Sequence, residues 1–266
     1  MNSPALVSRR QVLAALAVSP FSAVLTKATA PALSKSATFV LVHGAWHGDW
    51  CWKRLTPLLR AAGHEVFVPT LTGLGERSHL LSPDVDLNTH IKDITAVLEY
   101  EDLQEVVLVG HSYGGMVIAG VAEKAGTRLA QLVYLDAFLP ENGKALKDYT
   151  PANLDEAART KGEGWRLPPQ GSPRDFGVTN ERDIAWMQSR LGDQPYKTFT
   201  QSIQLSTDKS KSLAQTFIQC SKAPFFAEAA DRARRQGFRY RELFSAGHDA
   251  MITQPKELAK LLRSLV

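Results

Sequence analysis

Short runs of β-branched and aliphatic residues alternate along this chain with longer segments whose apolar residues recur at helical spacing. The apolar runs predict strands at residues 38–42, 65–68, 105–109, 129–135, 216–220 and 239–243. Helical spacing and helix-stop signals predict helices at residues 52–61, 87–99, 113–125, 227–235 and 255–265. Strands that alternate with helices form a mostly parallel sheet with helices on both faces, so the pattern predicts an α/β fold.

The alternation breaks between residues 137 and about 213. This stretch holds six prolines and scattered aromatic residues, which predicts a cap inserted into one domain rather than a second domain. A chain of 266 residues suits that organisation. Aromatic side chains of the cap could line an apolar pocket, and the candidates are Tyr149, Trp165, Phe176, Trp186, Tyr196 and Phe199.

The first thirty residues have the order of an export signal. Arg9 and Arg10 form a twin-arginine pattern, a mildly apolar run follows at 12–25, and small residues stand at 28–30. We expect residues 1–30 to be a signal peptide cleaved near Ala30, which predicts a periplasmic or secreted protein. The apolar run is too short and too interrupted to span a bilayer, so we expect no stable membrane anchor. An ordinary amphipathic helix is the alternative.

The charge balance changes once that signal is set aside. The whole chain has a formal charge of +4, but residues 1–30 hold three basic residues and no acidic one. The remainder is close to neutral, so we expect no nucleic-acid partner. The two cysteines, Cys51 and Cys220, lie far apart in sequence. Separate buried thiols are favoured, although an oxidising compartment would allow a disulfide.

A nucleophile motif follows the third predicted strand. Gly110-His111-Ser112-Tyr113-Gly114 joins that strand to a helix rich in small residues, which is typical of the strained strand-turn-helix called a nucleophile elbow. The serine then lies at a helix N-terminus, where free N–H groups favour a developing anion. Ser112 is therefore the predicted nucleophile.

The loop after the first strand predicts an oxyanion hole. It reads His43-Gly44-Ala45-Trp46-His47-Gly48, and a loop in this place supplies one backbone N–H beside that of the residue after the nucleophile. We assign the N–H groups of Ala45 and Tyr113. His43 and His47 are four residues apart, but no Cys, Asp or Glu pair joins them at ligand spacing, so we expect no metal.

His248, in a loop after the last strand, is the predicted general base because that loop returns to the sheet edge above the nucleophile. The acid is harder to assign. The turn at 221–225, its usual place in this fold, has no carboxylate, and Glu228 and Asp231 follow only on the next helix. Asp136 ends the strand expected beside the nucleophile strand, so we assign Asp136. A hinge Asp that accepts backbone N–H groups is the alternative.

Four segments resemble the branch of α/β-hydrolases that contains plant methylesterases, hydroxynitrile lyases and related bacterial esterases. They are residues 43–52, 71–79, 110–115 and 247–249. The resemblance is strong over 38–143 and moderate over 216–262, and it implies an α/β-hydrolase domain at 31–266. Many relatives carry the acid where this chain has Lys222-Ala223, whereas superfamily members with the acid one strand earlier support Asp136.

The resemblance and the motifs together predict a serine esterase. It would cleave a small hydrophobic or aromatic carboxylic ester through an acyl-enzyme, with water as second substrate and no cofactor. A hydroxynitrile lyase is one alternative. However, lyases that resemble this chain have Thr or Asn in place of Gly44, and some have Lys in place of Asp249. A non-catalytic ligand-binding protein is the other alternative, and an intact serine and histidine weigh against it.

Overall fold

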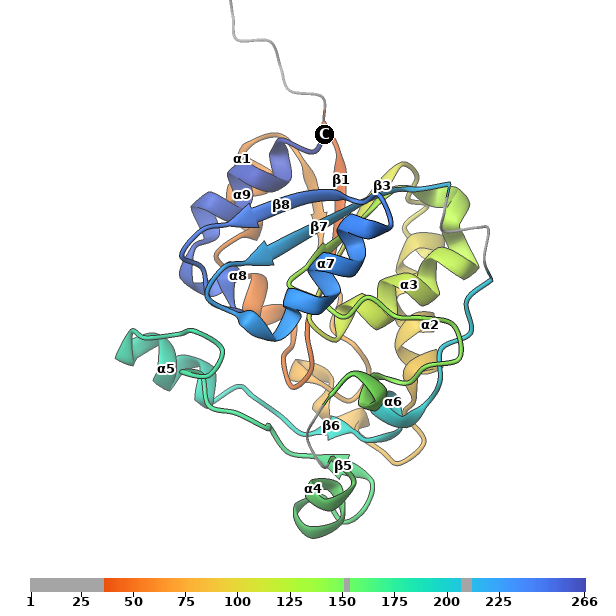
Figure 1. Cartoon of the computed structure of the whole chain (residues 1–266), viewed down its shortest axis with the longest axis vertical. Helices are drawn as coiled ribbons and strands as arrows, with labels where there is room; N and C mark the ends of the chain where they lie inside the picture. Colours follow the sequence, from red (N-terminus) through yellow and green to blue (C-terminus); the bar gives the residue numbers. More distant parts are fainter. Residues whose placement is uncertain (1–35, 151–153, 207–211) are drawn as a thin grey trace, which may run out of the picture. The chain divides into compact units, whose positions relative to one another are not determined.

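The computed structural model describes residues 36–150, 154–206 and 212–266. The predicted export signal lies outside these residues. Six strands form one sheet in the order β2-β1-β3-β4-β7-β8, and every neighbouring pair is parallel (Figure 1). The strands are β1 (Thr38–Val42), β2 (Glu65–Phe67), β3 (Val106–His111), β4 (Leu129–Leu135), β7 (Ala214–Cys220) and β8 (Arg239–Leu243). The predicted α/β fold is confirmed.

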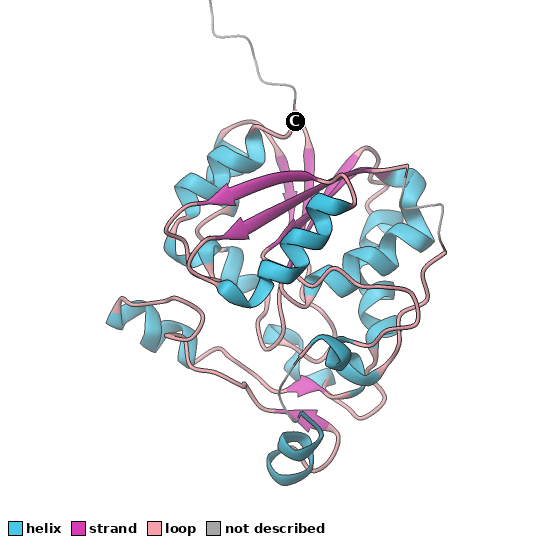
Figure 2. Ribbon diagram, in the orientation of Figure 1, coloured by secondary structure: helices cyan, strands magenta, loops and turns pink. Residues whose placement is uncertain are grey.

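Helices cover both faces of this sheet (Figure 2). One core cluster joins the sheet to α2 (Leu87–Tyr100), α3 (Gly114–Ala125) and α7 (Ala227–Arg235). The other joins it to α1 (Thr56–Ala61), α8 (Ala250–Thr253) and α9 (Pro255–Arg263). Short 3-10 helices occur at Asp49–Trp52, Gly75–Leu80, Gly126–Arg128 and Pro224–Phe226. Apolar residues at helical spacing thus face the sheet from either side.

Two helices show how well local signals place an element. Helix α2 begins as predicted, because the Asp86 side chain accepts the Thr89 N–H and the Thr89 hydroxyl accepts the Asp86 N–H. The predicted helix at 52–61 starts four residues late, at Thr56. Pro57 explains the difference, because proline has no N–H and is tolerated in the first turn of a helix but not in its interior.

The segment between β4 and β7 forms small elements of its own. They are η4 (Leu146–Tyr149), α4 (Leu154–Lys161), β5 (Arg166–Leu167), α5 (Glu181–Gln188), β6 (Gln194–Pro195) and α6 (Lys197–Thr200). Strands β5 and β6 pair antiparallel. Leu146, Leu154 and Phe199 belong to the same buried cluster as α2 and α3. The segment therefore packs directly on the main domain.

Two further features concern the described part of the chain. Neither Cys51 nor Cys220 is in a disulfide, and both are buried, as the sequence favoured. Among the described helices, none has the length and apolar character needed to cross a bilayer.

The strands of the sheet end at a common edge because they are parallel, and the loops that follow β1, β3, β4 and β8 meet there.

Candidate active site

Ser112 occupies a strained turn between β3 and α3. Its φ is 55°, a left-handed conformation that is uncommon for a residue with a side chain. Its N–H donates to the Leu135 carbonyl at 3.3 Å, and its own carbonyl accepts the Phe138 N–H at 3.1 Å. A Cβ at Gly114 would lie 2.7 Å from the Val42 carbonyl oxygen, so the turn needs glycine there. Backbone contacts to the neighbouring strands thus hold the strained serine in place.

His248 and Asp136 come together although they are 112 residues apart. Nδ1 of His248 lies 2.7 Å from Oδ2 of Asp136, whose side chain is fully buried. Strand register explains the contact, because Leu135 pairs with His111 and Asp136 therefore follows beside Ser112. The other carboxylate oxygen accepts the Cys220 N–H at 3.1 Å. Asp136 thus contacts the imidazole and also satisfies a backbone N–H, so both interpretations weighed for it describe real contacts.

The pKa of Asp136 is subject to opposing effects. Burial raises the pKa of this carboxyl group, and the hydrogen bond and charge of His248 act against that rise. A fully buried carboxylate requires such partners, because burying an unpaired charge is strongly unfavourable. The two hydrogen bonds to Asp136 supply them.

The competing acids lie elsewhere. Glu228 and Asp231 are exposed on α7, and Asp231 forms an ion pair with Arg234. The turn at 221–225 instead supports the loop that carries His248. The Lys222 N–H donates to the Ala246 carbonyl at 2.9 Å, and the Ser221 hydroxyl accepts the Ser245 N–H at 2.7 Å.

The first histidine of the loop after β1 is neutral. His43 accepts the Leu71 N–H at Nε2, so its proton is on Nδ1, which lies 2.8 Å from the Gly44 carbonyl oxygen. Burial lowers the pKa of His43 to about 3. Because a trans peptide is planar, the bond to Gly44 also sets the direction of the Ala45 N–H. The loop is therefore held where a backbone donor is expected.

Ala45, Ser112, Tyr113 and His248 all line one cavity of about 430 Å³. Of the six cap aromatics named as candidates, only Phe176 and Phe199 line it. The other aromatic walls come from Trp46, Phe138, Phe225 and Phe226. The sequence analysis did not select these four. Trp46 lies in the loop after β1, Phe138 in the segment after β4, and Phe225 and Phe226 in the short 3-10 helix at Pro224–Phe226. No such segment has a periodicity that indicates which way a side chain points.

Phe226 has a second contact with the site. Its ring stacks on the His248 imidazole, with centroids 5.2 Å apart and planes at 15°. The phenyl ring covers one face of the imidazole and so limits how His248 can tilt. Polar side chains also line the cavity, among them Gln170, Arg174, Asp175 and Lys222.

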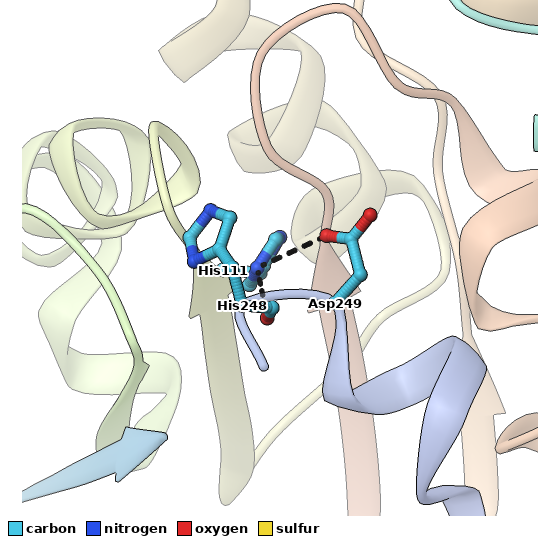
Figure 3. A group of neighbouring side chains, drawn as sticks. All are labelled: His111, His248 and Asp249. Carbon is cyan, nitrogen blue, oxygen red and sulfur yellow. Dashed lines mark hydrogen bonds and ion pairs between the residues drawn. The ribbon is translucent and has the colours of Figure 1, made fainter. Parts of the chain in front are cut away.

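His111, His248 and Asp249 form a compact group of side chains (Figure 3). Their potential ligand atoms lie within 4.8 Å of one another. Hydrogen bonds inside the protein already engage these side chains, because His111 Nε2 donates to the His248 carbonyl at 3.1 Å and His248 Nδ1 faces Asp136. Burial holds the pKa of His111 well below its ordinary value, so this ring is neutral. These side chains thus belong to one buried hydrogen-bond network, in which Nδ1 of His111 and Oδ1 of Asp249 have no hydrogen-bond partner.

Comparison with known proteins assigns this chain to a family. Residues 39–261 match the family described as "Alpha/beta hydrolase family". The chain belongs to this family. A carbendazim hydrolyzing esterase from Nocardioides sp. is 39% identical over 246 residues, which cover 86% of this chain and 99% of that protein. Methylesterase 1 of Arabidopsis thaliana is 37% identical over 255 residues, which cover 83% and 92%.

Solved structures agree on the fold. An extracellular α/β-hydrolase from a Paenibacillus species superposes with a TM-score of 0.75 at 24% identity, covering 86% of this chain and 98% of that one. The esterase relatives assign the chain to the predicted branch of the family. The protein is a carboxylic ester hydrolase.

Proposed function

We propose that this α/β-hydrolase cleaves small esters of hydrophobic or aromatic acids through an acyl-enzyme on Ser112. His248 takes the Ser112 hydroxyl proton as the oxygen attacks the ester carbonyl carbon. The N–H groups of Ala45 and Tyr113 donate hydrogen bonds to the tetrahedral oxyanion. His248 then protonates the departing alcohol oxygen. Water attacks the acyl group by the same route, releasing the acid and restoring Ser112.

The hydrogen bond between His248 and Asp136 is the observation that carries this proposal. With Asp136 accepting the proton on Nδ1, the other ring nitrogen is left unprotonated and free to act as a base. His248 and Ser112 line the same cavity, and we infer that this nitrogen is the base that takes the serine proton. A protein that only binds ligands on this fold has no need of such an arrangement.

The volume of the cavity indicates that the substrate is small. About 430 Å³ with aromatic walls suits a single aromatic or bicyclic acyl group joined to a small alcohol. Relatives named methylesterases suggest a methyl ester, and the relative named for carbendazim suggests that compound as a further test substrate. We therefore propose methyl esters of aromatic acids as the substrate class.

A substrate panel with a covalent probe tests both parts. Methyl benzoate and 4-nitrophenyl acetate should be hydrolysed, carbendazim should be included, and a 4-nitrophenyl ester of a sixteen-carbon acid should be poor. A fluorophosphonate should label the wild-type protein but not Ser112→Ala. Ser189→Ala, which changes an exposed serine on α5's C-terminal side, is the matched control. Equal labelling of wild type and Ser112→Ala would remove Ser112 from the mechanism.

Cyanohydrin cleavage is the second candidate, because an α-hydroxynitrile lyase of Arabidopsis thaliana is 38% identical over 104 residues. Gly44 argues against it. A Cβ added there would lie 2.9 Å from the Ser112 Cβ and 3.0 Å from Nδ1 of His111. The Thr or Asn found in lyases that resemble this chain would displace the nucleophile. We therefore propose hydrolysis, and release of cyanide from mandelonitrile at a rate comparable to ester hydrolysis would contradict it.

We also propose that the enzyme is exported. The support is the sequence of residues 1–30, with Arg9 and Arg10 before an apolar run and small residues. Replacing both arginines with lysine should retain the protein in the cytoplasm. The intact mass of the exported wild-type protein should correspond to a chain that begins near Pro31. Export that is unaffected by the double replacement would refute a twin-arginine signal.

A further inference from the structure

His47 differs from the other buried histidines in what its two ring nitrogens face. Nδ1 lies 2.7 Å from the Ala45 carbonyl oxygen, and Nε2 lies 3.1 Å from Oδ2 of Asp249. Each partner is an acceptor, and a neutral imidazole carries only one N–H. His43 contrasts with it, because one of its nitrogens faces an acceptor and the other a backbone N–H. The geometry at His47 therefore calls for two protons on the ring.

Asp249 supplies the matching negative charge. Its side chain is fully buried, 3.1 Å from Nε2 of His47 and 3.7 Å from Nε2 of His111. Burial alone would raise the pKa of Asp249, but the charge and hydrogen bond of His47 outweigh burial and hold the pKa below its ordinary value. Burial likewise opposes the charged form of His47, yet Asp249 raises the His47 pKa overall. The two groups form a buried ion pair.

This ion pair holds a strained peptide of the oxyanion loop. Trp46 has a φ of 65°, which is uncommon for a bulky residue and persists only where contacts enforce it. The peptide between Ala45 and Trp46 is fixed at both ends. Its carbonyl faces His47, and its N–H donates to the buried Gln194 side chain at 3.1 Å. The Ala45 N–H adjoins this peptide directly.

Asp249 also connects the loop to the other half of the site. It follows His248 in the chain, and its N–H donates to the Phe176 carbonyl at 3.0 Å. The ion pair thus joins the loop of Ala45 to the loop of His248 across 202 residues of sequence. Trp50 stacks on the His47 ring with centroids 5.0 Å apart, which shields the pair from water.

We propose that His47 is a positioning residue that acts as a buried imidazolium. Held by Asp249, it keeps the Ala45–Trp46 peptide in its strained conformation and thereby keeps the Ala45 N–H directed at the oxyanion. A charged donor strengthens the bond to the Ala45 carbonyl, because charge-assisted hydrogen bonds are roughly twice as strong as neutral ones. This inference rests on the proposed esterase mechanism for its catalytic consequence but not for the charge of His47.

Nuclear magnetic resonance of protein labelled with ¹⁵N-histidine tests that charge directly. Comparison with His47→Gln assigns the His47 ring signals, and both nitrogens should be protonated at pH 7. The other titratable groups around the ion pair are His43, Cys51, His111, Asp136, Cys220 and His248. A neutral His47 ring at pH 7 would overturn the proposal.

Kinetics test the positioning role. His47→Gln should lower kcat, and the rate of fluorophosphonate labelling, by about 100-fold, with KM changed less than about threefold, because a misplaced donor affects the transition state most. His79→Gln makes the same substitution at an exposed histidine and should be unchanged. A kcat for His47→Gln within twofold of wild type would refute the role.

Asp249→Asn separates the charge from the hydrogen bond. A neutral His47 can keep its proton on Nδ1 toward Ala45 while the asparagine amide donates to Nε2. The expected loss of kcat is therefore smaller, about tenfold, with a neutral His47 ring in the spectrum. An unchanged kcat with a neutral ring would show that the charge is dispensable and overturn the proposal. If wild-type Ser112 is not labelled at all, the proposed function fails instead, while the spectrum still reports on His47.

Discussion

Replacing Asp136 with asparagine removes one buried charge and leaves the shape of the side chain nearly unchanged. The two carboxylate oxygens of Asp136 both face N–H groups, one on His248 at 2.7 Å and one on Cys220 at 3.1 Å. An amide has one oxygen and one NH₂ group, so it can accept only one of these bonds. The substitution therefore forces a choice between the backbone and the imidazole.

Either choice weakens catalysis. If the amide oxygen stays with Cys220, its NH₂ group faces Nδ1 of His248 and favours the tautomer with the proton on Nε2, which cannot accept a proton from Ser112. If the oxygen turns to His248, the Cys220 N–H is left buried and unpaired, at a cost of about 1–3 kcal/mol. In both orientations the imidazolium loses its carboxylate. We expect kcat to fall by up to about four orders of magnitude, or about 5.4 kcal/mol.

The assay compares initial rates of 4-nitrophenyl acetate hydrolysis with thermal unfolding of the same samples. Asp136→Asn should fold, since the amide is isosteric and neutral in a fully buried place. Glu228→Gln and Asp231→Asn, on the exposed side of α7, are matched controls and should retain wild-type rates. The acid assignment is refuted if folded Asp136→Asn keeps more than a tenth of wild-type kcat, or if either control loses as much as Asp136→Asn.

Two further predictions concern Gly44 and pH. Gly44→Ala should fold but lose at least tenfold in kcat, because the new Cβ would lie 2.9 Å from that of Ser112, and unchanged activity would contradict this. Burial lowers the pKa values of His43 to about 3, of His90 to about 4, and of His111 as well, below the unfolded value of 6.5. The unfolded chain therefore binds more protons between about pH 4 and 6.5, so the unfolding free energy should fall as pH drops through that window, by up to about 1.4 kcal/mol per pH unit for each histidine. Thermal melts from pH 6.5 to 5 would show a Tm that declines, and a constant Tm would refute the reasoning.

Local patterns determined the elements of this protein and the serine of its site. Apolar runs and helical spacing predict the six parallel strands and their helices because burial imposes those periods on any strand or helix. The motif around Ser112 encodes its own turn, since Gly110 and Gly114, two residues on either side of the serine, permit the close backbone approach of this turn. The order of strands also suggests Asp136, because a residue that ends a neighbouring parallel strand reaches the same edge.

Tertiary structure alone decided which side chains complete the site. Phe226 stacks on His248, Trp46 and Phe138 line the cavity, and Nε2 of His47 faces Asp249. These residues lie in loops or in a single 3-10 turn, where no periodicity indicates the direction of a side chain. Their directions depend on backbone hydrogen bonds between loops that the sheet brings together from distant parts of the chain. The charge of His47 depends on the same convergence, because a histidine becomes a buried cation only where an acceptor faces each nitrogen. The sequence shows a histidine at position 47, but only the fold brings the Ala45 carbonyl and Asp249 to its two ring nitrogens.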